Sequence, residues 1–327
     1  MKNLLGNRVK LANLPTPIHH YPRLSEEFGF ELFVKRDDLT ESVASGNKIR
    51  KLEYVLYEAL REGADTLVTC GGVQSNHCRA VAWTAAKNGL NSVLLLKGAR
   101  PAHLQGNLLL SDLLGAKARF CSDNEYANID ALAGQVCAEL RSKGKKPFWI
   151  PLGASTATGS LGYVNMVREL QESGTTFDHI YCAVGSAGTF AGILLGCQYY
   201  NLPTPPTGIA VCNDTNHFMK ELNRIQSEFK KSYRLSVDLS GAGPAIDDSF
   251  VGKGYALNTD EELRQLIRLA RAEGLVLDPV YTLKAFLGLI GHSRDGRIKK
   301  KARVLFVHSG GHAGLLSKNE ELEPLLV

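Results

Sequence analysis

Long apolar runs are absent from this chain of 327 residues. Nowhere do about eighteen apolar residues follow one another, as a membrane-crossing helix requires, and residues 1–6 hold no apolar segment long enough for a signal peptide. We therefore expect no membrane partner, no secretion and a cytoplasmic location. The seven cysteines form no Cys-x-x-Cys pair, so we expect reduced thiols that pack as small core residues.

A strong charge of one sign is also absent. The net charge is +5 at pH 7, and basic residues are dense only at 143–146 and 297–303, where they are typical of solvated faces. We therefore expect no nucleic-acid partner. With 44% hydrophobic residues and no repeat or low-complexity tract, the chain can bury one large core or two smaller ones.

Nucleotide-binding fingerprints are missing as well, although one loop is rich in small residues: Gly185, Ser186, Ala187, Gly188 and Thr189. Its spacing is not G-x-G-x-x-G, and no Gly-Lys-Ser/Thr follows, which weakens nicotinamide and nucleoside triphosphate interpretations. The loop follows a buried strand and precedes a helix expected at about 191–200, so its backbone N–H groups can approach a phosphate. A tight strand-to-helix turn would have the same composition.

Lys48 is the most informative residue that is present. It lies where the loop-type stretch Ser45–Asn47 gives way to an amphipathic run, at the expected start of a helix. A lysine that is partly desolvated and close to other cations loses pKa and can form a Schiff base with an aldehyde such as pyridoxal phosphate. The alternative is a solvent-facing lysine in a basic helix start that includes Arg50 and Lys51.

Strand-like and helix-like segments alternate along the chain. We expect strands at 32–35, 66–70, 92–96, 118–121, 148–150, 180–184, 208–212 and 304–308. We expect helices at 76–88, 124–142, 160–172, 260–273 and 282–291. This alternation predicts an α/β protein with parallel sheet covered by helices.

Four separated stretches together resemble fold-type II pyridoxal-phosphate enzymes, in the branch of D-cysteine desulfhydrase and 1-aminocyclopropane-1-carboxylate deaminase. They are Gly46–Tyr54, Gly71–His77, Leu277–Thr282 and Val304–Gly311, and the similarity runs from about 15 to 316. The resemblance implies two three-layer α/β domains with mostly parallel sheets, as in tryptophan synthase β, and pyridoxal phosphate in the interdomain cleft. Residues 1–48 and 159–327 would form the larger domain and 49–158 an inserted smaller one. A homodimer is also implied.

The resemblance also implies roles for individual residues. Lys48 would hold the cofactor and later act as a base beside the substrate Cα, while Lys51 would add charge near the phosphate in the loop 185–189. Ser75 matches the catalytic serine, which binds the substrate carboxylate or relays a proton. Asn76 matches the partner of the cofactor's ring oxygen. Lys51 is also consistent with a surface lysine, and Ser75 and Asn76 with ordinary helix caps.

Three further residues complete the expected site around substrate. His77 would help Ser75 and Asn76 to bind substrate, although a histidine in a helix's first turn can also be solvated or bonded to backbone. Tyr255 and Tyr281 match two active-site tyrosines, whose phenols could move a proton if a nearby cation lowers their pKa. Tyrosine is equally a common core residue.

Thr282 and Ser309 distinguish the two activities of this branch. The deaminases carry glutamate and leucine at the matching positions, and the glutamate keeps the pyridine nitrogen protonated. Neutral hydroxyls at that nitrogen imply a weaker electron sink. A weaker sink suffices for β-elimination, where Cα–H is acidic and thiolate leaves well, whereas opening a cyclopropane ring demands more.

The sequence therefore predicts a pyridoxal-phosphate lyase that acts on a small amino acid, converting D-cysteine to pyruvate, ammonia and hydrogen sulfide. The alternatives are a 1-aminocyclopropane-1-carboxylate deaminase, an enzyme like cysteate sulfo-lyase, and a pyridoxal-phosphate-binding protein without turnover. We expect no metal site, because neither His19-His20 nor His308-x-x-x-His312 is accompanied in sequence by cysteines or carboxylates in a ligand pattern.

Overall fold

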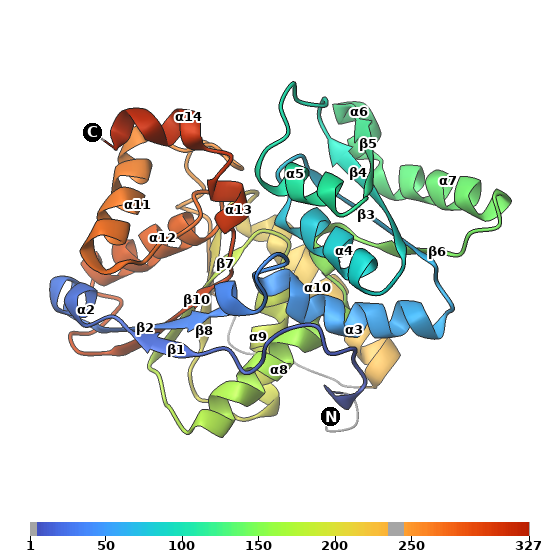
Figure 1. Cartoon of the computed structure of the whole chain (residues 1–327). Coiled ribbons are helices and arrows are strands. Elements are labelled where there is room, and N and C mark those ends of the chain that lie inside the picture. The colour runs from blue at the N-terminus through green and yellow to red at the C-terminus, as the bar shows by residue number, and fades with distance from the viewer. Residues whose placement is uncertain (1–4, 235–244, 327) are drawn as a thin grey trace.

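The computed structural model describes residues 5–234 and 245–326, so residues 1–4, 235–244 and 327 of the expected larger domain lie outside the described residues. Its strands form two separate sheets (Figure 1). The larger sheet has the order β1 (Ile18–His20), β2 (Glu31–Arg36), β10 (Arg303–His308), β7 (His179–Val184), β8 (Pro206–Ala210) and β9 (Ala245–Asp247). The smaller has the order β5 (Lys117–Cys121), β4 (Asn91–Lys97), β3 (Thr66–Gly72) and β6 (Pro147–Ile150).

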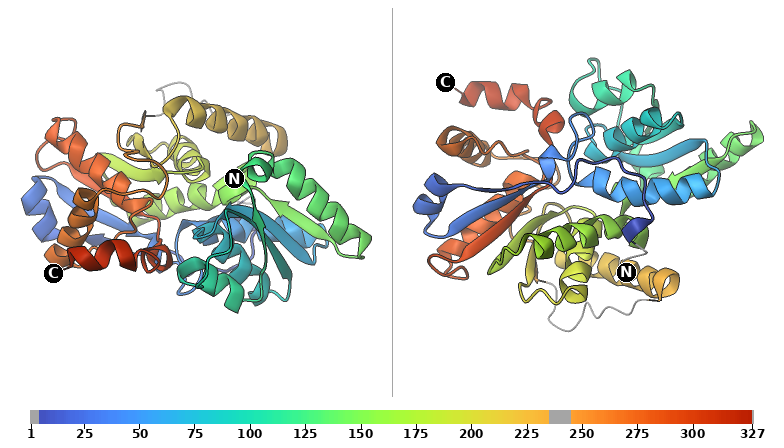
Figure 2. Two further views of the ribbon diagram at one scale, coloured as in Figure 1. Left: turned by 90° about the horizontal axis from the view of Figure 1, so that it is seen from above. Right: turned by 60° about the horizontal axis from the view of Figure 1, so that its bottom comes forward.

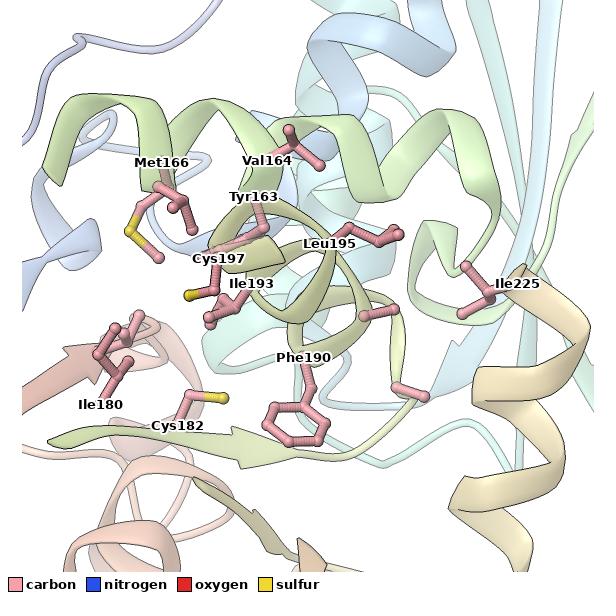
Figure 3. Close-up of a cluster of buried hydrophobic side chains, with 14 of the residues drawn as sticks. Tyr163, Val164, Met166, Ile180, Cys182, Phe190, Ile193, Leu195, Cys197 and Ile225 are labelled. Carbon is pink, nitrogen blue, oxygen red and sulfur yellow. The ribbon is translucent and has the colours of Figure 1, made fainter. Parts of the chain in front are cut away.

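Helices cover both faces of the larger sheet. One face is covered by α8 (Ala157–Ser173), α9 (Gly188–Tyr199) and α10 (Thr215–Tyr233). The other is covered by α2 (Pro22–Phe28), α11 (Asp260–Glu273) and α12 (Thr282–Arg294). In the first layer, buried side chains of α8 and α9 meet those of β7 (Figure 3). The two helices approach closely because Gly192 has no side chain, and a Cβ there would lie 2.3 Å from the Ser160 carbonyl oxygen.

Helices also cover both faces of the smaller sheet, which lies apart from the larger sheet (Figure 2). One face packs against α3 (Asn47–Arg61), α4 (Asn76–Lys87) and α5 (Gly106–Leu113). The other packs against α6 (Asp123–Ala127) and α7 (Ile129–Ser142). Within the described residues, every strand pairing is parallel except that of β1 with β2. The expected three-layer α/β class is confirmed.

Short elements complete the chain. They are the 3-10 helices η1 (Asp37–Leu39), η2 (Leu152–Ala154) and η3 (Glu323–Leu325) and the short helices α13 (His312–Leu315) and α14 (Asn319–Leu322). No helix in the described part of the chain is both long and apolar enough to cross a membrane. The division into domains at 49 and 159 stays a prediction, and all strands of the smaller sheet fall between those positions.

All expected strands are present, with shifts at their ends. The strand expected at 208–212 is β8, which leaves the sheet after Ala210, and the helix expected at 124–142 is two helices that meet at Asn128. The short strands β1 and β9 and the helices α2, α5 and α10 were not predicted. For α10 a signal exists, because its buried residues recur at helical spacing: Phe218, Leu222, Ile225 and Phe229.

A buried network of charges joins α3 to the larger sheet. The guanidinium of Arg50 donates to Asp37 through two nitrogens at 2.8 Å and to Glu169 at 2.7 and 3.0 Å. Lys35 donates to Glu169 at 2.8 Å, and the hydroxyl of Tyr163 donates to Asp37 at 2.6 Å. Two cations thus face two carboxylates with their hydrogen bonds made, the condition under which buried charges are tolerated.

Replacing Arg50 with methionine should reduce the free energy of unfolding by about 3–5 kcal/mol, because two buried carboxylates would then face Lys35 alone. Urea denaturation followed by circular dichroism measures this. The control is Arg61→Met at the exposed end of the same helix, which should change stability by less than about 0.5 kcal/mol. Equal losses in the two variants would contradict a special role for the network.

Candidate active site

Lys48 lies at the second residue of α3, directly against the loop that follows β10. The approach depends on Gly46, which has φ 110° and lies so close that a Cβ would be 2.5 Å from the Ser309 carbonyl oxygen. That oxygen accepts the backbone N–H of Asn47 at 3.0 Å. The start of α3 and the end of β10 are therefore locked together, and Lys48 is held over their junction.

Lys48 lines a cleft of about 360 Å³. Of the residues expected from sequence, these line the same cleft: Lys48, Ser75, Asn76, His77, Gly185, Ser186, Ala187, Thr189, Tyr255, Tyr281 and Ser309. Lys51, Gly188 and Thr282 are not among the lining residues. Residues far apart in sequence, carried by α3, α4, α9 and the loops after β7 and β10, thus meet at one site of the size usual for small molecules.

The amine of Lys48 is chemically prepared for attack on an aldehyde. Burial is the main reason that its pKa is lowered to about 8; the Asp278 carboxylate opposes this shift, and the positive charge of Arg79 adds to it. Its Nζ donates to the side-chain oxygen of Asn47 at 3.0 Å and lies 5.9 Å from the centre of the Tyr281 ring. The expected nucleophilic lysine has the electrostatic surroundings that it needs, and a solvent-facing lysine is excluded.

Arg79 is a charged residue whose importance the sequence reasoning missed. It lies in α4 with 1% of its surface exposed, and its Nη2 donates to the Ser45 carbonyl oxygen at 2.7 Å. No carboxylate of the described residues forms an ion pair with it within 4.0 Å. Burial lowers its pKa to about 10. Its field therefore reaches Lys48 without being cancelled by a paired anion.

The glycine loop between β7 and α9 has the form of a phosphate cradle. Ala187 has a left-handed φ of 59°, and α9 begins at Gly188, so the first-turn N–H groups point toward the cleft end of the helix. A Cβ at Gly188 would lie 2.7 Å from Nζ of Lys51, and one at Gly185 would lie 2.9 Å from the Tyr281 ring. Because side chains are excluded here, the backbone is open to a phosphate, which fits pyridoxal phosphate.

Lys51 lies behind this loop and is fully buried. Its Nζ donates to the Gly153 carbonyl oxygen at 2.9 Å and to Ser155 Oγ at 3.4 Å. Burial lowers its pKa well below the usual value, and Lys48 lowers it further. The surface-lysine alternative is wrong, and Lys51 supports the loop from behind instead of lining the cleft.

Ser75 and His77 flank Asn76 at the start of α4. Ser75 is the N-cap, and its Oγ accepts the Cys78 N–H at 3.2 Å; the same hydroxyl also contacts the Cys78 thiol, and Ser75 lines the cleft. His77 Nε2 lies 2.8 Å from the hydroxyl of Thr69, which donates onward to the Ile150 carbonyl oxygen. His77 is thus neither solvated nor bonded to backbone through Nε2. Burial and the two nearby lysines lower its pKa well below the usual value, so it is neutral.

The hydroxyls of Tyr255 and Tyr281 lie 2.6 Å apart, at the mouth of the cleft. Burial and the neighbouring phenol raise the pKa of Tyr281 well above its usual value, and burial also raises that of Tyr255. The condition that a cation lowers a phenol pKa is not met here, because burial is the largest influence on both phenols. Both phenols are neutral hydrogen-bond donors.

The segment that carries Tyr255 is held by lysines that sequence reasoning did not single out. Lys284 Nζ donates to the carbonyl oxygens of Val251 and Gly254, both at 2.6 Å, and Lys318 Nζ donates to that of Ala256 at 3.0 Å. No sequence signal pairs these lysines with a loop at least 28 residues away, because only the fold brings α12 and the C-terminal segment to it.

Thr282 does not line the cleft, whereas Ser309 does. The Oγ1 of Thr282 donates to Asp278 Oδ1 at 2.7 Å and accepts the Asp278 N–H at 2.7 Å. The Asp278 carboxylate also accepts the N–H groups of Val280, Tyr281 and Thr282. The cofactor-binding roles of Thr282 and Ser309 stay predictions.

His308 and His312 are accompanied by a carboxylate after all, contrary to the sequence expectation. Asp38 lies 3.9 Å from His308 Nδ1, and the ligand-type atoms of the three side chains lie within 4.8 Å of one another. Several of their polar atoms have hydrogen-bond partners: Arg36 binds both oxygens of Asp38, both imidazoles contact the Val276 carbonyl oxygen through Nε2, and the Gly310 N–H donates to His308. The expectation of no metal site stays a prediction.

Replacing Arg79 with methionine should raise the pKa of Lys48 above its value of about 8, because a nearby positive charge is lost. The rate at which cofactor-free protein combines with pyridoxal phosphate reports the unprotonated amine, and visible absorbance follows it across pH. The midpoint should move upward in Arg79→Met and stay near that of the wild type in Arg79→Lys. An unmoved midpoint in both variants would show that Arg79 does not act on Lys48.

Comparisons with known proteins agree with this geometry. The family model described as pyridoxal-phosphate dependent enzyme matches residues 9–310. A provisionally named 1-aminocyclopropane-1-carboxylate deaminase of Thermotoga maritima is 43% identical over 318 residues, which cover 96% of this chain and 99% of the relative. The mitochondrial bifunctional D-cysteine desulfhydrase/1-aminocyclopropane-1-carboxylate deaminase of Arabidopsis thaliana is 38% identical over 340 residues, which cover 100% of this chain and 83% of the relative.

A crystal structure described as that of an ACC deaminase homologue superposes with a TM-score of 0.90 at 38% identity, covering 99% of this chain and 98% of the other. Sequence and structure thus lead to the same group of proteins. This chain belongs to the pyridoxal-phosphate dependent enzymes, in the family of 1-aminocyclopropane-1-carboxylate deaminase and D-cysteine desulfhydrase.

Proposed function

We propose that this enzyme catalyses β-elimination from a small amino acid, with D-cysteine giving pyruvate, ammonia and hydrogen sulfide. One observation carries the proposal: no aspartate or glutamate is among the residues that line the cleft in the described chain. A protonated pyridine nitrogen needs an anionic partner, and Ser309 is neutral. A weaker electron sink follows, which suits a substrate with an acidic Cα–H and a good leaving group.

Bound pyridoxal phosphate would supply the aldehyde to which Lys48 attaches and the conjugated ring that takes up electrons from the substrate Cα. The first turn of α9 and the loop 185–189 would hold the phosphate, with Lys51 behind them. The amide of Asn76 would donate to the ring oxygen. Apart from Lys51 and Gly188, the residues in these assignments line one cleft.

The remaining residues divide the work on the substrate. The first turn of α4 and the hydroxyl of Ser75 bind the carboxylate, because helix N-termini attract anions. Lys48, with its lowered pKa, accepts or returns a proton near Cα. In the pair of neutral phenols, Tyr255 and Tyr281, one hydroxyl donates to the other, and the second hydroxyl donates to the leaving sulfur. The hand of the substrate decides which of these groups takes the α-proton.

Two alternative substrates have specific support. The names of the relatives favour 1-aminocyclopropane-1-carboxylate, and the Arabidopsis thaliana relative is named for both activities. A cysteate-like substrate is favoured by Lys97, whose side chain lines the cleft and offers a cation to a sulfonate. A protein that binds cofactor without turnover is disfavoured by the presence of Lys48 beside Ser75 and Tyr281. Homodimer formation and a cytoplasmic location stay predictions.

Pyruvate release from D-cysteine should exceed release from L-cysteine and from 1-aminocyclopropane-1-carboxylate when the three are assayed in parallel. Lys48→Ala should abolish release from all of them, since the amine to which the cofactor would attach is removed, and it serves as the blank. Dominant release from the cyclic substrate would overturn the proposal. If pyruvate is released from cysteate but from none of these three compounds, the substrate is reassigned to the sulfonate.

The double variant Thr282→Glu and Ser309→Leu should shift the ratio of activities toward the cyclic substrate by about tenfold or more, because a glutamate side chain is longer than that of threonine and would extend a carboxylate from position 282 toward the pyridine nitrogen. Relative kcat/KM values for D-cysteine and 1-aminocyclopropane-1-carboxylate measure the shift. Ser309→Leu alone is the control, and it should lose activity without changing preference. An unchanged ratio in the double variant would contradict the role given to the pyridine nitrogen.

A further inference from the structure

Asn107 is a buried asparagine that does not line the cleft but contacts a residue that does. It is the second residue of α5 and has 1% of its surface exposed. Its Nδ2 donates to the Gln74 carbonyl oxygen at 3.0 Å and to Asn76 Oδ1 at 3.0 Å. Its backbone N–H donates to Gln74 Oε1 at 2.9 Å. Three hydrogen bonds therefore join α5 to the segment that opens α4.

These contacts fix the orientation of two side-chain amides, first that of Asn107 and then that of Asn76. The Gln74 carbonyl oxygen only accepts hydrogen bonds, so the side chain of Asn107 must present its NH₂ group to it. The second N–H of that group then points at Asn76, which can receive it only through Oδ1. The NH₂ group of Asn76 consequently lies at the opposite edge of its planar amide, away from Asn107, and Asn76 is among the residues that line the cleft.

The position of Asn107 is itself tightly constrained by the C-terminal part of the chain. A Cβ at Gly314 in α13 would lie 3.3 Å from Asn107 Nδ2. At the neighbouring Gly106, which has φ 55°, a Cβ would lie 2.6 Å from the Ala313 carbonyl oxygen. The turn of α13 thus closes over Asn107, and the amide has no room to swing away from Asn76.

We propose that Asn107 is a positioning residue that holds the amide of Asn76 with its N–H groups toward the cleft, where one of them donates to the ring oxygen of the cofactor. The inference rests on the proposed role of Asn76 as the partner of that oxygen. A ring oxygen that carries negative charge needs a donor, and a reversed Asn76 amide would offer it an oxygen. Asn107 therefore controls whether the contact is attractive or repulsive.

The variant Asn107→Asp tests this directly, because aspartate has the same shape but only accepts hydrogen bonds. The Asn76 amide would turn to donate to the new carboxylate and present its oxygen to the cleft. Titration of the cofactor-free protein with pyridoxal phosphate should give an affinity about tenfold weaker than that of the wild type. The visible absorbance maximum of the bound cofactor should also shift, a change that general destabilisation would not produce.

A cycle with Asn76→Ala separates this inference from the role on which it depends. Asn76→Ala should weaken affinity and shift the absorbance on its own, and Asn107→Asp should add nothing in that background. If Asn76→Ala has wild-type cofactor affinity and absorbance, the role given to Asn76 is wrong, and so is the inference. If affinity and absorbance change in Asn76→Ala but not in Asn107→Asp, only the inference is wrong.

A second variant covers the case in which Asn107→Asp does not fold. Asn107→Ala removes the donor without adding charge and keeps the backbone N–H bond to Gln74. Asn76 is then free to take either orientation, so the loss of affinity should be smaller than in Asn107→Asp but in the same direction. Wild-type affinity and absorbance in a folded Asn107→Ala protein would overturn the inference.

Discussion

The buried guanidinium of Arg50 is the point at which the parts of this enzyme are held together. Arg50 belongs to α3, whereas its partners Asp37 and Glu169 belong to η1 and α8, on the side of the larger sheet. The same helix packs through other side chains against the core of the smaller sheet. Because Lys48 lies two residues earlier, this ion network sets where the reactive amine is held relative to the glycine loop of α9.

Much of the site could be predicted because its residues lie in short contiguous motifs. Each of the motifs around Lys48, Ser75 and Gly185 joins a loop or strand end to the start of a helix, which is where parallel α/β sheets place their ligands. The strands could be predicted because strands of parallel sheets are apolar on both faces and read as short hydrophobic runs. Such local features are recorded in the sequence directly.

The predictions that failed depend on contacts between distant segments. The hydroxyl of Thr282 donates to the carboxylate of Asp278, which lies just before α12. No motif match reveals this contact. The phenol pKa values rise instead of falling because burial is the largest influence on both. Arg79 and Asn107 were missed because neither lines the cleft: Arg79 acts on Lys48 through its charge, and Asn107 contacts Asn76 from outside the cleft.

The composition of the Arg50 network has an electrical consequence. Two positive and two negative side chains in contact form a compact multipole, whose potential falls off with distance much faster than that of a single charge. Arg50 is accordingly absent from the charges that shift the pKa of Lys48, although it is close in sequence, whereas the unpaired Arg79 is among them. The network anchors α3 but has little effect on the pKa of Lys48. Arg50 therefore stabilises the position of the amine, and Arg79 lowers its pKa.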